Sequence, residues 1–374
     1  MELPAPWSSQ LSRAPARDRV AICHSNRTSC RDITEVCPLE PILPTPEFDQ
    51  PVAFDDGLLW LRLRLPFALD HVNLLLCDDG DGWTLLDTGF GDAATRAVWS
   101  GLLGGLLAGR PVRRVIGTHF HPDHVGLAGW LCGQTGAELL MSRTEWLTCR
   151  ALALDDTDGF VAASERNYRR GGLDEALVAR QRERRNPYRK GVSEPPASYA
   201  RVVAGERIAL AGSSWRVLVG EGHAPEQLTL YCAERNLLLV ADQVLPKISP
   251  VIGVWGGEPD ADPLGDFQRS LPQYLDLPSD CRVFPAHGAP FLGLHERVTQ
   301  LAVHHDQRLE RTLEACAAPA TAAEVLRGLF TRPLDAHQTG FALAETLAHL
   351  NRLLRTGQLE RWLESDGVYR YRAC

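Results

Sequence analysis

The amino-acid sequence predicts a mixed α/β or α+β fold in which short strands alternate with helices, followed by a helical C-terminal region. Apolar and polar residues alternate over residues 61–65, as in a half-buried strand. Two apolar runs, residues 73–76 and 83–86, flank an Asp-Gly-Asp-Gly turn, which is typical of a hairpin. In such folds catalytic side chains are expected on the loops at strand ends. Further strands are predicted at residues 112–117, 138–141, 215–219 and 237–240.

The length of 374 residues allows one large domain with smaller additions. Residues 1–50 contain seven prolines and little periodic apolar pattern, so they are interpreted as an extended N-terminal leader. Residues 51–293 are predicted to form the catalytic domain, with a polar, arginine-rich helical insertion at residues 150–200. Residues 294–374 are predicted to form three helices and a hairpin, an order that suggests a winged helix. These helices are expected at residues 294–317, 322–330 and 343–354.

The net charge of -8 argues against a protein held on nucleic acid or anionic lipid by a global basic field. No stretch approaches the roughly 20 apolar residues of a membrane helix, and the residues after Met1 do not resemble a signal peptide. Ten cysteines without paired spacing indicate reduced thiols, so the cytoplasm is the expected location. Cys23, Cys30 and Cys37, with His24, could hold a small metal site, but ordinary thiols are the preferred interpretation.

The clearest functional signal is the segment Thr-His-Phe-His-Pro-Asp-His at residues 118–124, which follows an apolar run. At the end of a strand, alternation places His119 and His121 on one side. The turn that follows them lets Asp123 and His124 face the same cavity from another side. Imidazole and carboxylate are ligands that suit zinc or iron. One loop could therefore serve two metal ions.

This segment resembles the signature motif of the metallo-β-lactamase superfamily. Four further motifs of that family follow its order along the chain: Leu-Asp-Thr-Gly at residues 86–89, Gly222-His223, Ala241-Asp242 and Pro-Ala-His-Gly at residues 285–288. The resemblance covers roughly residues 55–290. It implies the four-layer αββα sandwich of that family, with the winged-helix-like region following it.

The resemblance also implies a site with two zinc ions, or iron or manganese in their place. One ion is assigned to His119, His121 and His223, and the other to Asp123, His124 and His287, while Asp242 bridges them. Asp87 is implied to orient a ligand histidine by accepting a hydrogen bond. Two ions lower the pKa of a shared water, so a metal-bridging hydroxide would attack the substrate. Asp242 and Asp123 are the implied catalytic carboxylates, with Asp123 relaying a proton.

Residues near the implied metal site indicate which branch of the family the chain resembles. Asp242 stands where true β-lactamases have a cysteine or a non-bridging residue, so the site is more similar to the glyoxalase II, lactonase and RNA-processing branches. Glu226 could meet a substrate amine or cap a strand, and Lys247 could clamp an anion. Nine basic residues between Arg166 and Lys190 could attract an anionic substrate or form a solvated helix face.

The C-terminal region is similar to the tail of the lactamase-beta-2-like group, which includes metal-dependent single-strand endoribonucleases and, in related branches, thioesterases. The residues that carry this resemblance are His304, His305, Arg308 and residues 347–351 and 357–360. Ten arginines and ten acidic residues balance over residues 294–374, whereas a nucleic-acid-binding winged helix should present a basic face. Packing or homo-oligomerisation therefore explains this region better than a nucleic-acid partner.

The expected function is hydrolysis of a small ester or thioester, acyl-CoA-like or a lactone. The expected partner is a small acyl compound, with no membrane. Two alternatives stay open: a single-strand-specific, metal-dependent endoribonuclease and, behind it, β-lactam hydrolysis.

Overall fold

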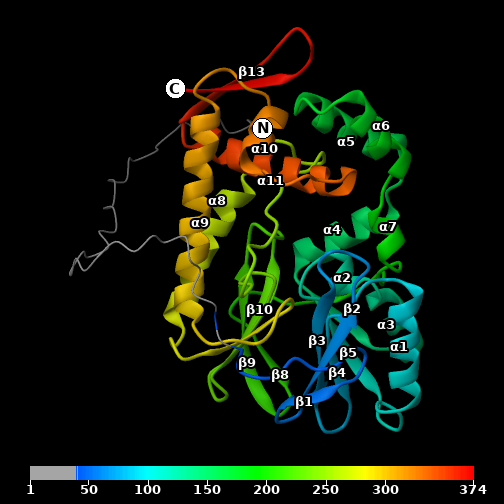
Figure 1. The fold of residues 1–374 in the computed structure, drawn as a ribbon. Coiled ribbons are helices and arrows are strands. Elements are labelled where there is room, and N and C mark those ends of the chain that lie inside the picture. Colours follow the sequence, from blue (N-terminus) through cyan, green and yellow to red (C-terminus); the bar gives the residue numbers. More distant parts are fainter. Residues whose placement is uncertain (1–38, 40) are drawn as a thin grey trace, which may run out of the picture. The chain divides into compact units, whose positions relative to one another are not determined.

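Two β-sheets face each other in the catalytic domain, and helices cover the outer face of each (Figure 1). The computed structural model describes Leu39 and residues 41–374. Most of the predicted leader, and the group formed by Cys23, Cys30 and Cys37, therefore lie outside the described residues.

The first sheet has seven strands in sequence order. The hairpin predicted from the Asp-Gly-Asp-Gly turn is confirmed by the antiparallel pairing of β3 with β4, with Leu75 opposite Leu86. From β4 onward the strands are parallel. The strands are β1 (Val52–Asp55), β2 (Leu58–Arg64), β3 (His71–Asp78), β4 (Trp83–Leu86), β5 (Val112–Ile116), β6 (Glu138–Met141) and β7 (Ala200–Arg201).

The second sheet has five strands in the order β12-β11-β10-β9-β8, and only β11 and β12 are parallel. Its inner face packs on that of the first sheet through an apolar cluster that includes Trp60, Trp215 and Phe284. The strands are β8 (Arg207–Leu210), β9 (Ser213–Gly220), β10 (Gln227–Cys232), β11 (Leu237–Ala241) and β12 (Arg282–Pro285).

Burial on both faces explains why the first sheet is so apolar. Along β3, Leu74 and Leu76 face the helices of one outer layer, while Leu75 and Cys77 face the second sheet. The predicted αββα sandwich is thus confirmed. The helices of this outer layer are α1 (Ala93–Gly104), α2 (Pro122–Val125), α3 (Ala128–Thr135) and α4 (Arg143–Leu154), and α8 (Pro263–Ser270) with the 3₁₀ helix η1 (Leu271–Asp276) lies on the second sheet.

The predicted insertion forms three helices that contact the C-terminal region. Gly171, at the end of the first of them, accepts a hydrogen bond from Ala323 and packs against Leu343. Four of its arginines are held in ion pairs by acidic neighbours, and they are Arg169, Arg182, Arg185 and Arg189. The helices are α5 (Asp158–Arg170), α6 (Glu175–Arg184) and α7 (Tyr188–Gly191).

The C-terminal region has the predicted order of three helices and a hairpin. The last helix starts at Ala336, seven residues before the predicted position, because Asp335 and Gln338 form a capping box. Leu343 and Leu350 on this helix are fully buried, in agreement with a packing role. The elements are α9 (Leu294–Ala315), α10 (Ala322–Leu329), α11 (Ala336–Arg355), β13 (Leu359–Leu363) and β14 (Tyr369–Ala373). Among the described residues, no helix is both long and apolar enough to span a membrane.

Two buried histidines make the C-terminal region sensitive to acid. The rings of His305 on α9 and His349 on α11 lie 5.7 Å apart, and neither nitrogen of His305 has a hydrogen-bond partner among the described residues. Burial lowers the pKa of His305 to about 2 and that of His349 to about 4. The unfolded chain binds protons at these positions below about pH 6.5 and the folded chain does not. The free energy of unfolding should therefore fall by about 1.4 kcal/mol per histidine and pH unit between about pH 6.5 and 4.

The variant His305→Leu tests this expectation, because leucine removes the titrating ring and leaves an apolar side chain beside Phe267. His304 and Arg308 also face the pair and disfavour its protonation, whereas the buried carboxyl of Glu345 has a raised pKa and offsets part of the effect. Urea unfolding at pH 7 and pH 5 should show a smaller loss of stability in the variant than in the wild type. Equal losses would refute the assignment.

Candidate metal centre

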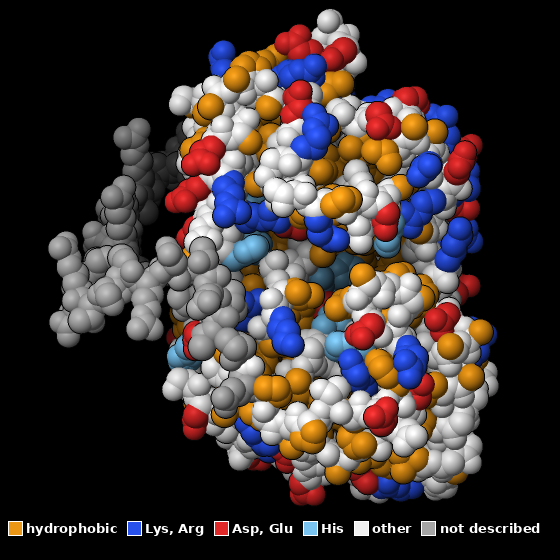
Figure 2. Space-filling model, viewed as in Figure 1, with side chains coloured by type: hydrophobic (Ala, Val, Ile, Leu, Met, Phe, Trp, Pro, Cys, Tyr) orange, Lys and Arg blue, Asp and Glu red, His pale blue; other side chains and the backbone are white. Residues whose placement is uncertain are grey.

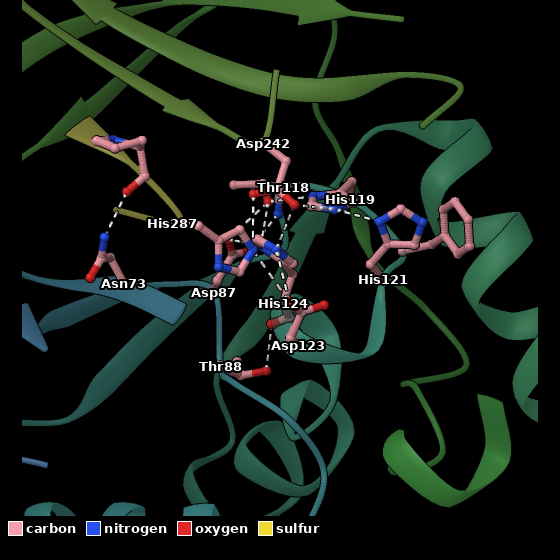
Figure 3. A network of polar contacts seen from close by, with 12 residues as sticks. Asn73, Asp87, Thr88, Thr118, His119, His121, Asp123, His124, Asp242 and His287 are labelled. Atoms are coloured by element: carbon pink, nitrogen blue, oxygen red, sulfur yellow. Dashed lines mark hydrogen bonds and ion pairs between the residues drawn. The ribbon is translucent and has the colours of Figure 1, made fainter. Parts of the chain in front are cut away.

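Loops at the ends of strands bring the predicted ligands together, as Figure 3 shows. Strands β4 and β5 are parallel neighbours in one sheet, and β11 and β12 are parallel neighbours in the other. The carboxyl ends of each pair therefore meet at one edge, where the two sheets face each other. The residues lie after β4 (Asp87), β5 (His119, His121, Asp123, His124), β9 (His223), β11 (Asp242) and β12 (His287).

The seven predicted ligands form two adjacent groups. Within each group the ligand atoms lie within 4.8 Å of one another. The grouping matches the sequence assignment, since His119, His121, His223 and Asp242 form one group and Asp123, His124 and His287 form the other.

Three ring nitrogens converge in the first group. His121 Nδ1 lies 2.9 Å from His119 Nε2 and 3.0 Å from His223 Nε2, and the last two atoms are 3.3 Å apart. A tetrahedral zinc ion with bonds of about 2.0–2.1 Å requires neighbouring ligand nitrogens about 3.3 Å apart. The donor set and its spacing therefore fit a metal ion.

The Asp242 carboxylate reaches both groups. Its Oδ2 lies 3.3 Å from His223 Nε2 and 3.5 Å from His124 Nε2, while its Oδ1 lies 3.3 Å from His287 Nε2. Two buried atoms here, Asp242 Oδ1 and His124 Nε2, have no hydrogen-bond partner among the described residues. Burying such atoms unpaired costs free energy, which bound cations would recover.

Asp87 lies directly behind the second group. Its Oδ2 is 2.8 Å from His124 Nδ1, on the ring edge opposite the orphaned Nε2. Thr118 donates its backbone N–H to Asp87 Oδ1 and its hydroxyl to Oδ2, each at 2.8 Å. Asp87 has a φ of 61°, a left-handed conformation that is unusual for a residue other than glycine. The fold thus holds this carboxylate where it orients the His124 ring, the role expected from sequence.

Backbone carbonyls orient two more ligand rings. His223 Nδ1 lies 2.8 Å from the carbonyl oxygen of Val251, and His287 Nδ1 lies 2.7 Å from that of His71. A proton held on Nδ1 by such an acceptor leaves the Nε2 lone pair of each ring directed at the cluster.

The electrostatics of the cluster favour cations. Burial and neighbouring histidines lower the pKa of His119 well below its usual value, and burial with His223 lowers that of His121 to about 3. These two rings are therefore neutral and can act as ligands. Burial opposes the protonation of His287, yet the nearby carboxylates raise its pKa to about 10. A field that retains a proton so strongly also stabilises a metal ion.

Glu145 is a buried residue of this region that the sequence did not reveal. It lies on α4, accepts a hydrogen bond from the backbone N–H of Phe120 at 2.8 Å, and accepts another from that of Glu226 at 2.6 Å. Burial raises its pKa to about 8. Its carboxyl group links the loop of His119 and His121 to the loop of His223. An acidic residue in the first turn of a helix looks ordinary in a sequence, so no local signal could have identified it.

Asn73 was missed for the same reason. Its side-chain amide donates to the carbonyl oxygens of Pro285 and Gly288 at 3.0 and 2.7 Å, and so holds the loop that carries His287. The contact joins two segments more than 200 residues apart in sequence, and nothing near Asn73 predicts it.

The two predicted substrate contacts have different outcomes. Glu226 Oε2 accepts a hydrogen bond of 2.7 Å from the backbone N–H of Thr144 in the first turn of α4, so Glu226 caps a helix rather than a strand. Lys247 is exposed and makes no ion pair or hydrogen bond with any described residue. Its role as an anion clamp stays a prediction.

The capping contact predicts the effect of removing the Glu226 side chain. The variant Glu226→Ala should lower the free energy of unfolding by about 1 kcal/mol, because it leaves a backbone donor of α4 unpaired. Glu226→Gln retains an acceptor oxygen and should lose much less. Urea denaturation of both variants checks this, and equal losses would contradict the capping role.

Helix α7 of the insertion contacts the ligand loop. The Tyr188 hydroxyl donates to the carbonyl oxygen of Phe120, which lies between two predicted ligands. Gly191 accepts a hydrogen bond of 2.8 Å from Gly91. In the space-filling view histidine side chains are visible within a hollow of the surface, with Lys and Arg side chains near it (Figure 2). The insertion therefore lies beside the opening of the site.

Comparison with known proteins decides the family. A model of the metallo-beta-lactamase superfamily matches residues 68–287, which contain all seven predicted ligands. The chain belongs to the metallo-β-lactamase superfamily. A second model, for the metallo-beta-lactamase-like C-terminal domain, matches residues 309–374. The C-terminal helices and hairpin are thus a known companion of this catalytic domain.

Relatives within the superfamily cover nearly the whole chain. A beta-lactamase domain protein from Burkholderia ambifaria is 38% identical, and its crystal structure matches 90% of this chain and 98% of its own with a TM-score of 0.82. The family protein TTHA1429 from Thermus thermophilus is 33% identical, covers 85% and 99%, and has a TM-score of 0.72. The probable metallo-hydrolase YqjP of Bacillus subtilis (strain 168) is 24% identical over 84% of this chain and 97% of its own.

One relative has a more specific description. The atrochrysone carboxyl ACP thioesterase of Aspergillus fumigatus is 25% identical over 163 residues, which cover 40% of this chain and 48% of that protein. Together with the His/Asp cluster, the family assignment makes this protein a metallo-hydrolase of the superfamily with a site able to bind metal.

Proposed function

We propose that the protein hydrolyses a small ester or thioester, such as an acyl-CoA-like compound or a lactone, with two metal ions held by the seven clustered residues. The observation that carries the proposal is the position of the Asp242 carboxylate between the two groups of histidines. Zinc is the preferred metal for nitrogen and carboxylate ligands at these spacings, with iron or manganese as alternatives.

Bound metal ions would lower the pKa of a water molecule and stabilise the negative charge that develops on a substrate carbonyl oxygen. The chain's own residues prepare the site for this chemistry. Asp87 and the carbonyl of His71 keep the inward nitrogens of His124 and His287 free of protons. The side chain of Asp123 is 19% exposed, whereas that of His287 is 3% exposed. Asp123 is therefore the carboxylate best placed to carry a proton between the site and solvent.

The thioester is supported by chemistry and by similarity. A thiolate leaves readily, so its cleavage needs little beyond an activated water and an open pocket. The partial similarity to a thioesterase points the same way, although it covers less than half of either chain. The seven cysteines among the described residues are free thiols, which fits the proposed cytoplasmic location.

Endoribonuclease activity is the second candidate, and the arginines of the C-terminal region weigh against it. Arg352, Arg361, Arg370 and Arg372 each pair with an acidic side chain, at 3.2 Å in the case of Arg352 and Asp262. Paired arginines release few counterions on binding phosphates, so we expect weak RNA binding. β-Lactam hydrolysis ranks third, because Asp242 stands where a cysteine or a non-bridging residue is usual.

A single activity screen tests the proposal. The metal-loaded protein is assayed against acyl-CoA thioesters, lactones, nitrocefin and single-stranded RNA, with an Asp242→Ala variant to exclude contaminating enzymes. We expect cleavage of a thioester or lactone that the variant lacks. Metal-dependent RNA cleavage with submicromolar affinity at low salt, absent in the variant, would overturn the proposal in favour of the ribonuclease.

A further inference from the structure

Five aromatic rings form a continuous series, here called the aromatic row. Successive ring centroids are 5.2 Å apart from Phe90 to Phe67, 6.3 Å from Phe67 to His337, 5.0 Å from His337 to Phe341 and 5.5 Å from Phe341 to Trp255. Most neighbouring rings meet edge to face, an arrangement that stabilises aromatic pairs. The rings come from the β2–β3 loop, the loop after β4, α11 and the loop after β11.

One end of the aromatic row rests on the loop that carries four predicted ligands. A Cβ atom added to Gly191 would lie 2.4 Å from the Phe90 ring and 3.1 Å from Pro122 Cβ. Phe90 and Pro122 therefore flank the same glycine of α7. Pro122 stands between His121 and Asp123, one ligand from each metal group.

The other end is tied to the His223 ligand. The carbonyl oxygen of Val251 accepts the hydrogen bond from His223 Nδ1, and four residues later the same loop presents Trp255. Between them, Val254 donates to the carbonyl oxygen of Ala344 on α11 at 3.0 Å. The loop thus fixes Trp255 between a metal ligand and the C-terminal helix that carries Phe341.

The rings are unusually exposed for their size. Phe67 is 45% exposed, Trp255 41% and Phe341 40%, and the same loop also exposes Ile248 and Val251. An apolar patch that is contiguous with a polar catalytic centre is the usual form of a ligand site, in which the apolar part binds and the polar part reacts.

We propose that the aromatic row binds the apolar acyl chain of the substrate and so selects medium or long acyl groups over acetyl. This inference rests on the proposed ester or thioester hydrolysis and names its substrate class. The acyl carbonyl would lie at the metal cluster, while the hydrocarbon chain lies along the rings. A surface that contacts one side of the chain should recover part of the roughly 0.8 kcal/mol available per buried methylene.

The test compares thioesters of N-acetylcysteamine, a neutral leaving group, with acetyl, butanoyl, hexanoyl and octanoyl chains. We expect kcat/KM to rise by about 30-fold or more from acetyl to octanoyl, which is less than full burial of six methylenes would give. The variants Trp255→Ala and Phe341→Ala should each reduce the octanoyl-to-acetyl ratio by about tenfold. The matched control is Leu363→Ala, which removes an equally exposed apolar side chain on β13 and should leave the ratio as in the wild type.

A binding measurement separates this inference from the proposed function. The octanoyl and acetyl amides of cysteamine cannot be cleaved as thioesters, and calorimetry should show tighter binding of the octanoyl amide that Trp255→Ala weakens. Chain-length-dependent binding without thioester cleavage would refute the proposed function and leave the aromatic row as an acyl site. Cleavage with equal kcat/KM for all chains would refute the aromatic row alone. A change of oligomeric state in Phe341→Ala with an unaltered ratio would make the aromatic row a subunit interface and overturn the proposal.

Discussion

Replacing Asp242 by alanine is expected to reduce kcat/KM by roughly 10³-fold or more and to lower the metal content of the protein. The carboxylate is the only predicted ligand whose two oxygens lie near both histidine groups, at 3.3 Å from His223 Nε2 and from His287 Nε2. Its loss would remove a negative charge and a shared ligand, and metal-assisted stabilisation of the transition state is worth several kcal/mol. The isosteric Asp242→Asn tests the charge alone, and both effects should persist in it.

A matched control is available on the neighbouring strand. Cys232 is fully buried, and Cys232→Ala should cost some stability but little activity per folded molecule. Steady-state kinetics and metal analysis of the three variants at equal folded fraction decide the matter. Similar losses in the Cys232 and Asp242 variants would show that the carboxylate has no special role.

Replacing Asp87 by alanine is expected to weaken metal affinity by about 10–100-fold, although Asp87 is not itself a predicted ligand. Its carboxylate accepts the hydrogen bond from His124 Nδ1 and two more from Thr118. Without it the His124 ring can rotate or hold its proton on the wrong nitrogen, so Nε2 is no longer presented to a metal. Competition with a chromophoric chelator measures the affinity.

Asp79 offers a control of the same chemistry at the β3–β4 turn. It too accepts hydrogen bonds from a threonine hydroxyl, that of Thr84, and from a backbone N–H, that of Ala211, and it also pairs with Arg114. Asp79→Ala should therefore lower stability and leave metal affinity near that of the wild type. If the two variants lost metal equally, the effect of Asp87 would be one of general stability.

The sandwich could be predicted from sequence because its signals are local. Alternation along β2, the Asp-Gly-Asp-Gly hairpin and the apolar runs of β11 and β12 each need only a few neighbouring residues. The start of α11 was placed too late because its first turns, around His337 and Phe341, are partly exposed and lack a regular apolar face. Its capping box was the better signal.

The ligand residues were predictable for a different reason. Metal coordination demands particular side chains, and four of the seven lie within six residues. Glu145 and Asn73 act through contacts with backbone groups of distant segments, so their own neighbours carry no trace of the role. The aromatic row was equally hidden, since it joins residues as far apart as Phe67 and Phe341.

The most direct test of a two-metal centre is the metal content of the intact protein. After loading with zinc, or with iron or manganese, and removal of free ions, elemental analysis by mass spectrometry should find close to two ions per chain, because seven ligand groups exceed what one ion can use. The Asp242→Ala variant should retain fewer. A wild-type protein that holds no metal after loading, while remaining folded, would contradict the assignment of these seven residues.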